Sequence, residues 1–321
     1  MSYLQTIADL SRVIRHSPLL KLKHRDQHLF AKLEYTNLMG SIKDRAACYL
    51  LQNAINQGRI NEQSVIVEST SGNFGVALAV LCKKLGLKFI PVIDANITRE
   101  KEALLEALSY EIVKVEDRDS TGGYLLNRLA RVQDLLQELP HSFNPNQYEN
   151  PDNYLSYYHT LAAEVCNSFT RLDFVFVSVS TGGTITGLSL RLKKKFPQVK
   201  VIAVDIEGSV VFGQTPRIRR ISGLGSSFRA PIIEHALIDD VMILSHQQIV
   251  DGCNALLREQ GIFAGGSSGA AYYAAMKTLA PLRNKGQQAV FICPDKGSAY
   301  LDTIYNQEWV DKYILNKDVV V

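Results

Sequence analysis

Short apolar runs rich in β-branched residues alternate along the chain with longer segments whose apolar positions recur at helical spacing. The predicted strands span residues 64–68, 88–93, 111–115, 173–178, 199–204 and 288–292. The predicted helices span residues 72–85, 98–108, 124–139, 154–168 and 184–196. Short strands separated by helices are typical of βα units and parallel sheets. We therefore predict an α/β protein.

A loop rich in Pro and Asn at 140–153 interrupts this alternation. The chain has 321 residues, which is long for one domain and sufficient for two. We therefore expect the loop to lie near the boundary between an N-terminal and a C-terminal α/β domain.

Composition and charge narrow the class of partner. The chain is 46% hydrophobic, and its 35 Lys and Arg against 32 Asp and Glu leave a net charge of only +3. That balance gives no reason to expect nucleic acid or a membrane as a partner. The N-terminus lacks the apolar segment of a signal peptide, so we expect a cytoplasmic protein. The five scattered Cys favour neither disulfides nor a metal site.

Turns rich in Gly and hydroxyl residues occur at strand–helix junctions, at 68–75 and 178–184, and a third precedes an Ala-rich helix, at 261–269. In open α/β sheets, ligands bind in such turns. In the second turn, Gly182 and Gly183 leave backbone N–H groups uncovered at a helix N-terminus. Hydroxyl donors beside them come from Ser180, Thr181 and Thr184. This pattern predicts a phosphate cradle. The alternative for any one of the three turns is an ordinary helix cap followed by a turn.

A lysine accompanies these turns. Lys43 follows a Gly-Ser turn at the start of a predicted helix, where it is either a solvated cation or a point of covalent attachment. The donors at 69–73 suit a carboxylate. A desolvated lysine favours Schiff-base chemistry because burial disfavours its ammonium form. Lysine, phosphate cradle and carboxylate nest together predict pyridoxal phosphate bound as an imine.

Four segments of the chain, at 40–45, 70–73, 181–184 and 265–269, resemble the motifs of the cysteine-synthase-like, fold type II pyridoxal phosphate enzymes. Their order and spacing match over nearly the whole chain. The resemblance implies two open twisted α/β domains of the tryptophan synthase β-like kind, with the cofactor in the cleft between them, and a homodimer. The implied domains are 36–145, and 1–35 together with 146–321.

The resemblance also implies roles for individual residues. Lys43 would form the imine and remove the substrate α-proton, while Asn73 would contact the ring hydroxyl and Ser267 the pyridine nitrogen. The cofactor phosphate would be held by Ser180, Thr181, Gly182, Gly183 and Thr184. The substrate would be held by Thr70, Ser71, Gly72 and Gln147, with Gly223 in a loop at the cleft mouth.

Several positions depart from ordinary cysteine synthases, among them Phe74 and Tyr148. These departures resemble N-(2-amino-2-carboxyethyl)-L-glutamate synthases, which join O-phospho-L-serine to L-glutamate, through an aminoacrylate, on the way to 2,3-diaminopropionate and siderophores. Phosphate is a leaving group of about −2 charge. An arginine would bind it bidentately, and Arg128 is the candidate, with Tyr148 and Ser180 as neighbouring donors. The alternative for Arg128 is a solvated helix residue.

Two other functions stay open on the sequence. The first is a cysteine or cystathionine synthase that uses sulfide or a thiol as its nucleophile. The second, of another class, is a catalytically inactive homologue that serves as a regulatory binding partner. The presence of Lys43, Asn73, the 180–184 turn and Ser267 argues against the second, because a protein without the chemistry would not need all of them.

Overall fold

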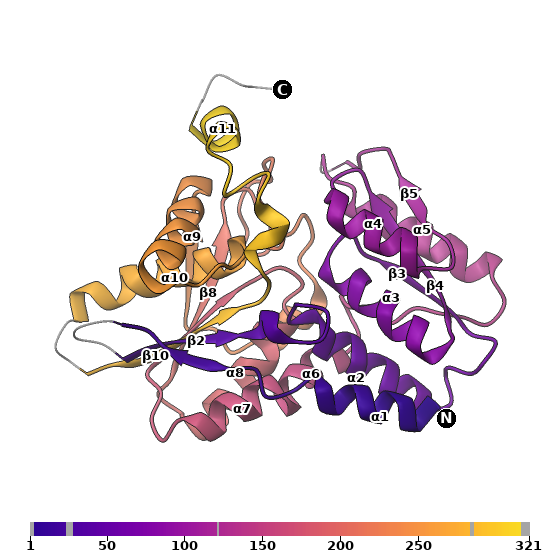
Figure 1. The fold of residues 1–321 in the computed structure, drawn as a ribbon, viewed down its shortest axis with the longest axis horizontal. Coiled ribbons are helices and arrows are strands. Elements are labelled where there is room, and N and C mark those ends of the chain that lie inside the picture. The colour runs from indigo at the N-terminus through magenta and orange to yellow at the C-terminus, as the bar shows by residue number, and fades with distance from the viewer. Residues whose placement is uncertain (1–2, 24–27, 121, 283–285, 316–321) are drawn as a thin grey trace.

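A computed structural model describes residues 3–23, 28–120, 122–282 and 286–315, and its strands form two separate sheets (Figure 1). The larger sheet contains, in spatial order, β1 (Leu19–Lys21), β2 (His28–Leu33), β10 (Gln288–Cys293), β7 (Phe174–Ser178), β8 (Lys200–Ile206) and β9 (Asp240–Leu244). All neighbours in it pair in parallel except β1, which is antiparallel to β2. The inner strands are buried along almost their whole length, because helices cover parallel sheets on both faces.

The smaller sheet is parallel throughout. It contains, in spatial order, β5 (Val113–Val115), β4 (Lys88–Asp94), β3 (Val65–Ser69) and β6 (Ser142–Phe143). The turn after β3 leads directly into a helix, as expected for a βα unit. The carboxyl end of β3 therefore delivers the first glycine-rich turn to one edge of this sheet.

The α-helices surround both sheets (Figure 1). They are α1 (Tyr3–Val13), α2 (Lys43–Asn56), α3 (Asn73–Leu85), α4 (Arg99–Leu108), α5 (Leu125–Glu138), α6 (Asp152–His159), α7 (Leu161–Ser168), α8 (Gly183–Lys195), α9 (His246–Gln260), α10 (Gly266–Leu279) and α11 (Gln307–Val310). Helical turns of other types are η1 (Glu34–Thr36), η2 (Pro231–His235), η3 (Ala280–Leu282), η4 (Gly297–Tyr300) and η5 (Asp311–Leu315).

The α/β prediction is confirmed, and most predicted elements lie within a few residues of the observed ones. The prediction of one helix over 154–168 is wrong. Thr160 has φ −112° and ψ −85°, outside the helical region, and it divides the segment into α6 and α7. The strand β9 was not predicted, although residues 241–244 are a continuous apolar run; it is an edge strand in which only Leu244 is buried.

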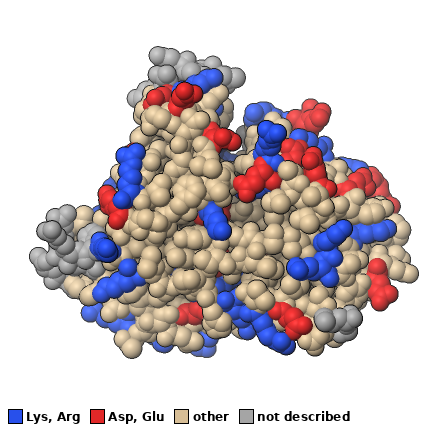
Figure 2. All heavy atoms as spheres, in the orientation of Figure 1, with Lys and Arg blue, Asp and Glu red and all other residues tan. Residues whose placement is uncertain are grey.

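Positive and negative side chains are interspersed over the face shown in Figure 2. This distribution agrees with the small net charge of +3 and shows no single-sign patch on that face. Within the described ranges, no helix is both long and apolar enough to cross a membrane. The five cysteines are all buried and free.

A buried charge network anchors the first turn of α2. The Arg45 guanidinium, whose side chain is fully buried, pairs with Glu34 at 2.6 Å and with Glu164 at 2.7 Å. Lys32 pairs with Glu164 at 2.6 Å. The network holds two cations and two carboxylates, so its charges cancel. It thereby ties α2, where Lys43 is the first residue, to β2 and α7.

Glu164 should make the stability of this network depend on pH. Burial by itself raises the pKa of Glu164, but hydrogen bonds and charge from Arg45, with a hydrogen bond from Lys32, outweigh it and lower the pKa from 4.5 to about 2. A lowered carboxyl pKa stabilises the fold at pH values above 4.5, and this contribution disappears as the pH falls toward 2. We expect Glu164→Gln to lower the free energy of unfolding at pH 7 by about 3 kcal/mol.

Urea unfolding at pH 7 and pH 3 would measure this effect. The difference between wild type and Glu164→Gln should shrink as the pH falls, because protonation removes the same charge. The matched control is Glu138→Gln, whose carboxylate is exposed and pairs with Arg131 at the surface, and it should change stability little. A Glu164→Gln effect that is the same at both pH values would contradict the prediction.

Candidate active site

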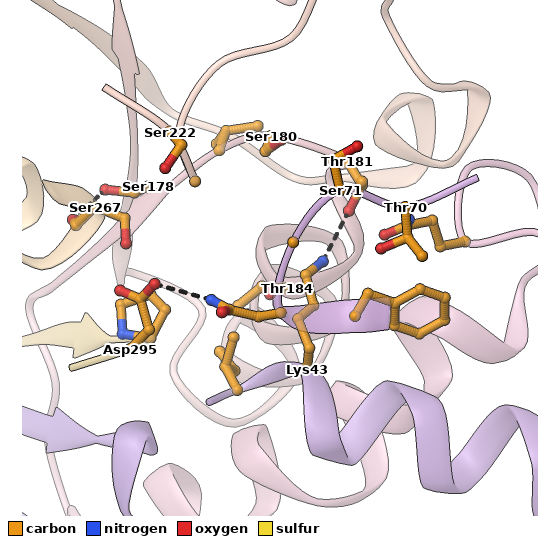
Figure 3. A pocket seen from close by; sticks show the side chains of 18 of the residues that line it. Lys43, Thr70, Ser71, Ser178, Ser180, Thr181, Thr184, Ser222, Ser267 and Asp295 are labelled. Atoms are coloured by element: carbon orange, nitrogen blue, oxygen red, sulfur yellow. Dashed lines mark hydrogen bonds between the residues drawn. The ribbon is translucent and has the colours of Figure 1, made fainter. Parts of the chain in front are cut away.

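The residues predicted from the sequence meet at one cavity of about 250 Å³ (Figure 3). Four helices, α2, α3, α8 and α10, begin at its wall. Helix N-termini carry partial positive charge and free N–H groups, so their convergence favours anions. The predicted residues that line the cavity are Lys43, Thr70, Ser71, Gly72, Asn73, Arg128, Gln147, Tyr148, Ser180, Thr181, Gly182, Thr184, Gly223 and Ser267.

Lys43 lies at the base of this cavity. The turn before it depends on Gly40, whose φ of +82° lies in the left-handed region that favours glycine. Its amine is 3.3 Å from the hydroxyl of Thr181, toward which it points in Figure 3. Burial lowers the pKa of Lys43 to about 8, and the nearby Glu68 opposes this only in part. A much larger fraction of Lys43 is therefore a neutral, nucleophilic amine than for an exposed lysine.

The second glycine-rich turn caps α8. Gly182 is the N-cap with φ +90°, and a Cβ there would lie 3.0 Å from the Cβ of Ile233. Gly183 does not line the cavity, unlike the rest of the turn. It packs against Asn153 instead, where a Cβ would lie 2.4 Å from the amide oxygen. Glycine is thus needed at both positions, at Gly182 mainly for its backbone conformation and at Gly183 for close packing.

An acidic residue that the sequence did not single out lies beside Asn73. The Asn73 side-chain amide donates to Asp295 at 2.8 Å, and the Tyr300 hydroxyl donates to the same oxygen at 2.8 Å. The other Asp295 oxygen is buried and has no hydrogen-bond partner among the described residues. Asp295 follows β10. Ligands bind beyond the carboxyl ends of parallel strands, so this position was the sequence signal that could have identified Asp295 as a site residue.

Arg128 is enclosed rather than solvated, so the surface alternative for it is wrong. Its side chain is 11% exposed and lies in the first turn of α5, against the cavity. It pairs with Asp94 at 3.0 Å and donates to the Ser71 hydroxyl at 3.1 Å. Ser71 in turn donates to Asp94 at 2.9 Å. Asp94, at the end of β4, therefore fixes both the guanidinium and the 70–72 turn.

Glu68 and Tyr148 are buried near Arg128. Burial raises the pKa of Glu68 to about 8, although backbone hydrogen bonds and the charge of Arg128 oppose the shift. Burial also raises the pKa of Tyr148. Glu68 is therefore protonated in a large fraction of molecules at neutral pH, so it compensates the positive charge of Arg128 less than an ionised carboxylate would.

The donor set fits pyridoxal phosphate. It supplies an amine of lowered pKa at Lys43, N–H groups and hydroxyls at the start of α8 for a phosphate, and polar groups at Asn73 and Ser267 for a ring. The protein family described as "Pyridoxal-phosphate dependent enzyme" matches residues 10–295. The chain belongs to this family. It is accordingly an enzyme that depends on pyridoxal phosphate.

Three solved structures superpose closely on this family member. An O-acetylserine dependent cystathionine β-synthase from Helicobacter pylori is 33% identical, with a TM-score of 0.86 over 92% of this chain and 98% of its own. A hydrogen sulfide-producing enzyme from Fusobacterium nucleatum is 28% identical, with a TM-score of 0.85 over 91% and 99%. An O-ureido-L-serine synthase is 28% identical, with a TM-score of 0.82 over 96% of both chains.

One cavity residue of this pyridoxal-phosphate enzyme gave no signal in the sequence. Lys101, in the first turn of α4, lines the cavity and is 7% exposed. A single lysine among the charged residues at 99–102 looks like part of a solvated helix start, and only the packing of α4 against the cavity distinguishes it.

Proposed function

We propose that the enzyme is a β-replacement synthase that joins O-phospho-L-serine to L-glutamate, giving N-(2-amino-2-carboxyethyl)-L-glutamate and phosphate. The observation that carries this proposal is the enclosed, oriented guanidinium of Arg128 at the wall of the cavity that Lys43 also lines. Such a product would serve the synthesis of 2,3-diaminopropionate for siderophores.

The remaining roles follow the placement of the side chains. Bound pyridoxal phosphate would withdraw electrons from the α-carbon of the amino acid. Lys43 would hold the cofactor and then carry the α-proton, a task suited to an amine with a pKa of about 8. The turn at the start of α3, Thr70–Gly72, with Gln147, would bind the substrate carboxylate. The turn 180–184 would bind the cofactor phosphate, Asn73 and Ser267 would contact its ring, and Gly223 would line the entrance.

The leaving group is the part of the proposal that Arg128 supports. A guanidinium has five N–H donors. Arg128 donates one to Ser71, and its Nε lies 3.0 Å from Asp94 without forming a hydrogen bond. Donors therefore remain for a phosphate ester, which carries a charge of about −2. Arginine binds such a group bidentately. A neutral acetyl ester would gain much less from this cation. The phenol of Tyr148 lines the same cavity as a further donor. Ser180 lines it as well, with its hydroxyl donating to the Gly225 carbonyl at 3.0 Å.

A second candidate function is a cystathionine or cysteine synthase that uses O-acetyl-L-serine. The observation that favours it is the 33% identity to the Helicobacter pylori O-acetylserine dependent cystathionine β-synthase. The two functions differ in the leaving group and in the nucleophile, so one experiment separates them.

The purified holoenzyme should be incubated with O-phospho-L-serine or O-acetyl-L-serine, each with glutamate, sulfide or homocysteine. We expect phosphate release with phosphoserine and a product of the mass of N-(2-amino-2-carboxyethyl)-L-glutamate with glutamate. Mass spectrometry and a phosphate assay measure both. Product only from acetylserine with sulfide or homocysteine would establish the second candidate. Cofactor binding without turnover of either serine ester would instead indicate a regulatory homologue.

The assembly and the domain division are also proposals. We propose a cytoplasmic homodimer with one domain at 36–145 and the other formed by 1–35 and 146–321. Light scattering after size-exclusion chromatography should give twice the chain mass of 35.7 kDa. A peak at the monomer mass would contradict the dimer.

A further inference from the structure

Lys101 is a buried cation that has no role in the proposed function. It is 7% exposed, and it forms no ion pair with any Asp or Glu of the described ranges. The contact that its ammonium does make is to the ring of Tyr300, whose centroid is 5.9 Å away. A buried ammonium group is costly unless it is paired with an anion. The position of Lys101 on a ligand cavity therefore points to a ligand that brings the negative charge.

A second cavity of about 380 Å³ is also lined by Lys101. It shares Asn73, Lys101 and Asp295 with the active-site cavity, so the two spaces meet at these side chains. Its other walls are the 35–40 segment before Lys43, Val76 of α3, Glu100 and Leu104 of α4, and Lys296, Ser298 and Ala299 after Asp295. Lys296 is exposed at its rim. A ligand that occupies either cavity can thus reach the ammonium group of Lys101.

We propose that Lys101 binds the carboxylate of the second substrate and that the second cavity receives the rest of that molecule. This inference rests on the proposed β-replacement. The negative groups of the first substrate and the cofactor already have donors, at Thr70–Gly72, at Arg128 and at the start of α8. Lys101 is therefore left for the acceptor, which should be an amine or thiol that carries a carboxylate. A neutral nucleophile gains nothing from this lysine, so Lys101 would select between acceptor classes.

Two thiols that differ in one group test this selection in the holoenzyme. One is 3-mercaptopropionate, which carries a carboxylate, and the other is 2-mercaptoethanol, which carries a hydroxyl. We expect Lys101→Met to lower kcat/KM for 3-mercaptopropionate and for glutamate by roughly 10- to 100-fold, the worth of a charge-assisted hydrogen bond. The value for 2-mercaptoethanol should stay unchanged. Phosphate release in a single turnover without acceptor should also keep its rate.

Two further variants act as controls. Lys101→Arg keeps the charge and should restore much of the use of 3-mercaptopropionate. Lys296→Met removes an exposed lysine from the rim of the same cavity and should change kcat/KM by less than about threefold, because exposed charges are screened. An equal loss with both thiols, or a loss of single-turnover phosphate release in Lys101→Met, would overturn the proposal.

Failure of the proposed function gives a different result. If wild type releases no phosphate from phosphoserine, or leaves glutamate unused, the proposed function is wrong. The thiol pair then still tests Lys101 with O-acetyl-L-serine as the first substrate. A preference for the anionic thiol that disappears in Lys101→Met would support the acceptor site whichever serine ester is natural.

Discussion

Replacing Lys43 with alanine is expected to lower kcat by at least about 10³-fold, because it removes both the covalent attachment and the group that carries the α-proton. The variant should also lose the fixed cofactor. Borohydride reduction of wild type, followed by mass spectrometry of the peptides, should find pyridoxal phosphate on the peptide that contains Lys43. The same treatment of Lys43→Ala should find none.

The cavity contains two lysines, and this makes the test discriminating. Lys43 begins α2 and has a pKa lowered by burial to about 8, so it is the better nucleophile on physical grounds. Lys101→Met is the matched control, and it should keep the cofactor bound covalently. Cofactor fixed on the Lys101 peptide, or phosphate release by Lys43→Ala at the wild-type rate, would contradict the assignment of Lys43.

Much of the cavity could be predicted because many of its residues lie close together in the sequence. A strand, a glycine-rich turn and a helix start follow one another within about ten residues, so the chain itself fixes the geometry of the 178–184 turn. Gly182 illustrates this, since its left-handed backbone at the N-cap of α8 agrees with the sequence motif. The alternation of strands and helices is local in the same sense, and it sufficed for the α/β class.

The residues that were missed depend on contacts between distant segments. Asn73 and Asp295 are hydrogen-bonded although they are 222 residues apart, and no periodicity links them. Asp94 orients Arg128 from the smaller sheet, and Lys101 reaches the cavity only through the packing of α4. A single charged residue near the end of a strand or the start of a helix is common at protein surfaces. Its function becomes visible only when the tertiary structure shows what it faces.

Arg128→Met is expected to lower kcat/KM for O-phospho-L-serine by about 10²–10³-fold, the usual cost of removing a group that stabilises charge in the transition state. The value for O-acetyl-L-serine should change little, because a neutral ester needs no such cation. The first half of the reaction isolates the effect, since phosphate or acetate release can be followed without an acceptor. Arg131→Met, on the same helix but paired with Glu138 at the surface, is the matched control and should resemble wild type.

The contacts of Arg128 allow a competing explanation that the experiment must separate. The guanidinium also holds Ser71 at 3.1 Å and neutralises Asp94, which is 4% exposed. Its removal strands a buried carboxylate and could displace the turn proposed to bind the substrate carboxylate. The double variant Arg128→Met/Asp94→Asn removes that stranded charge. If it regains acetylserine but not phosphoserine, Arg128 acts on the leaving group; if both esters stay equally impaired, Arg128 supports the 70–72 turn instead and the phosphoserine assignment loses its main support.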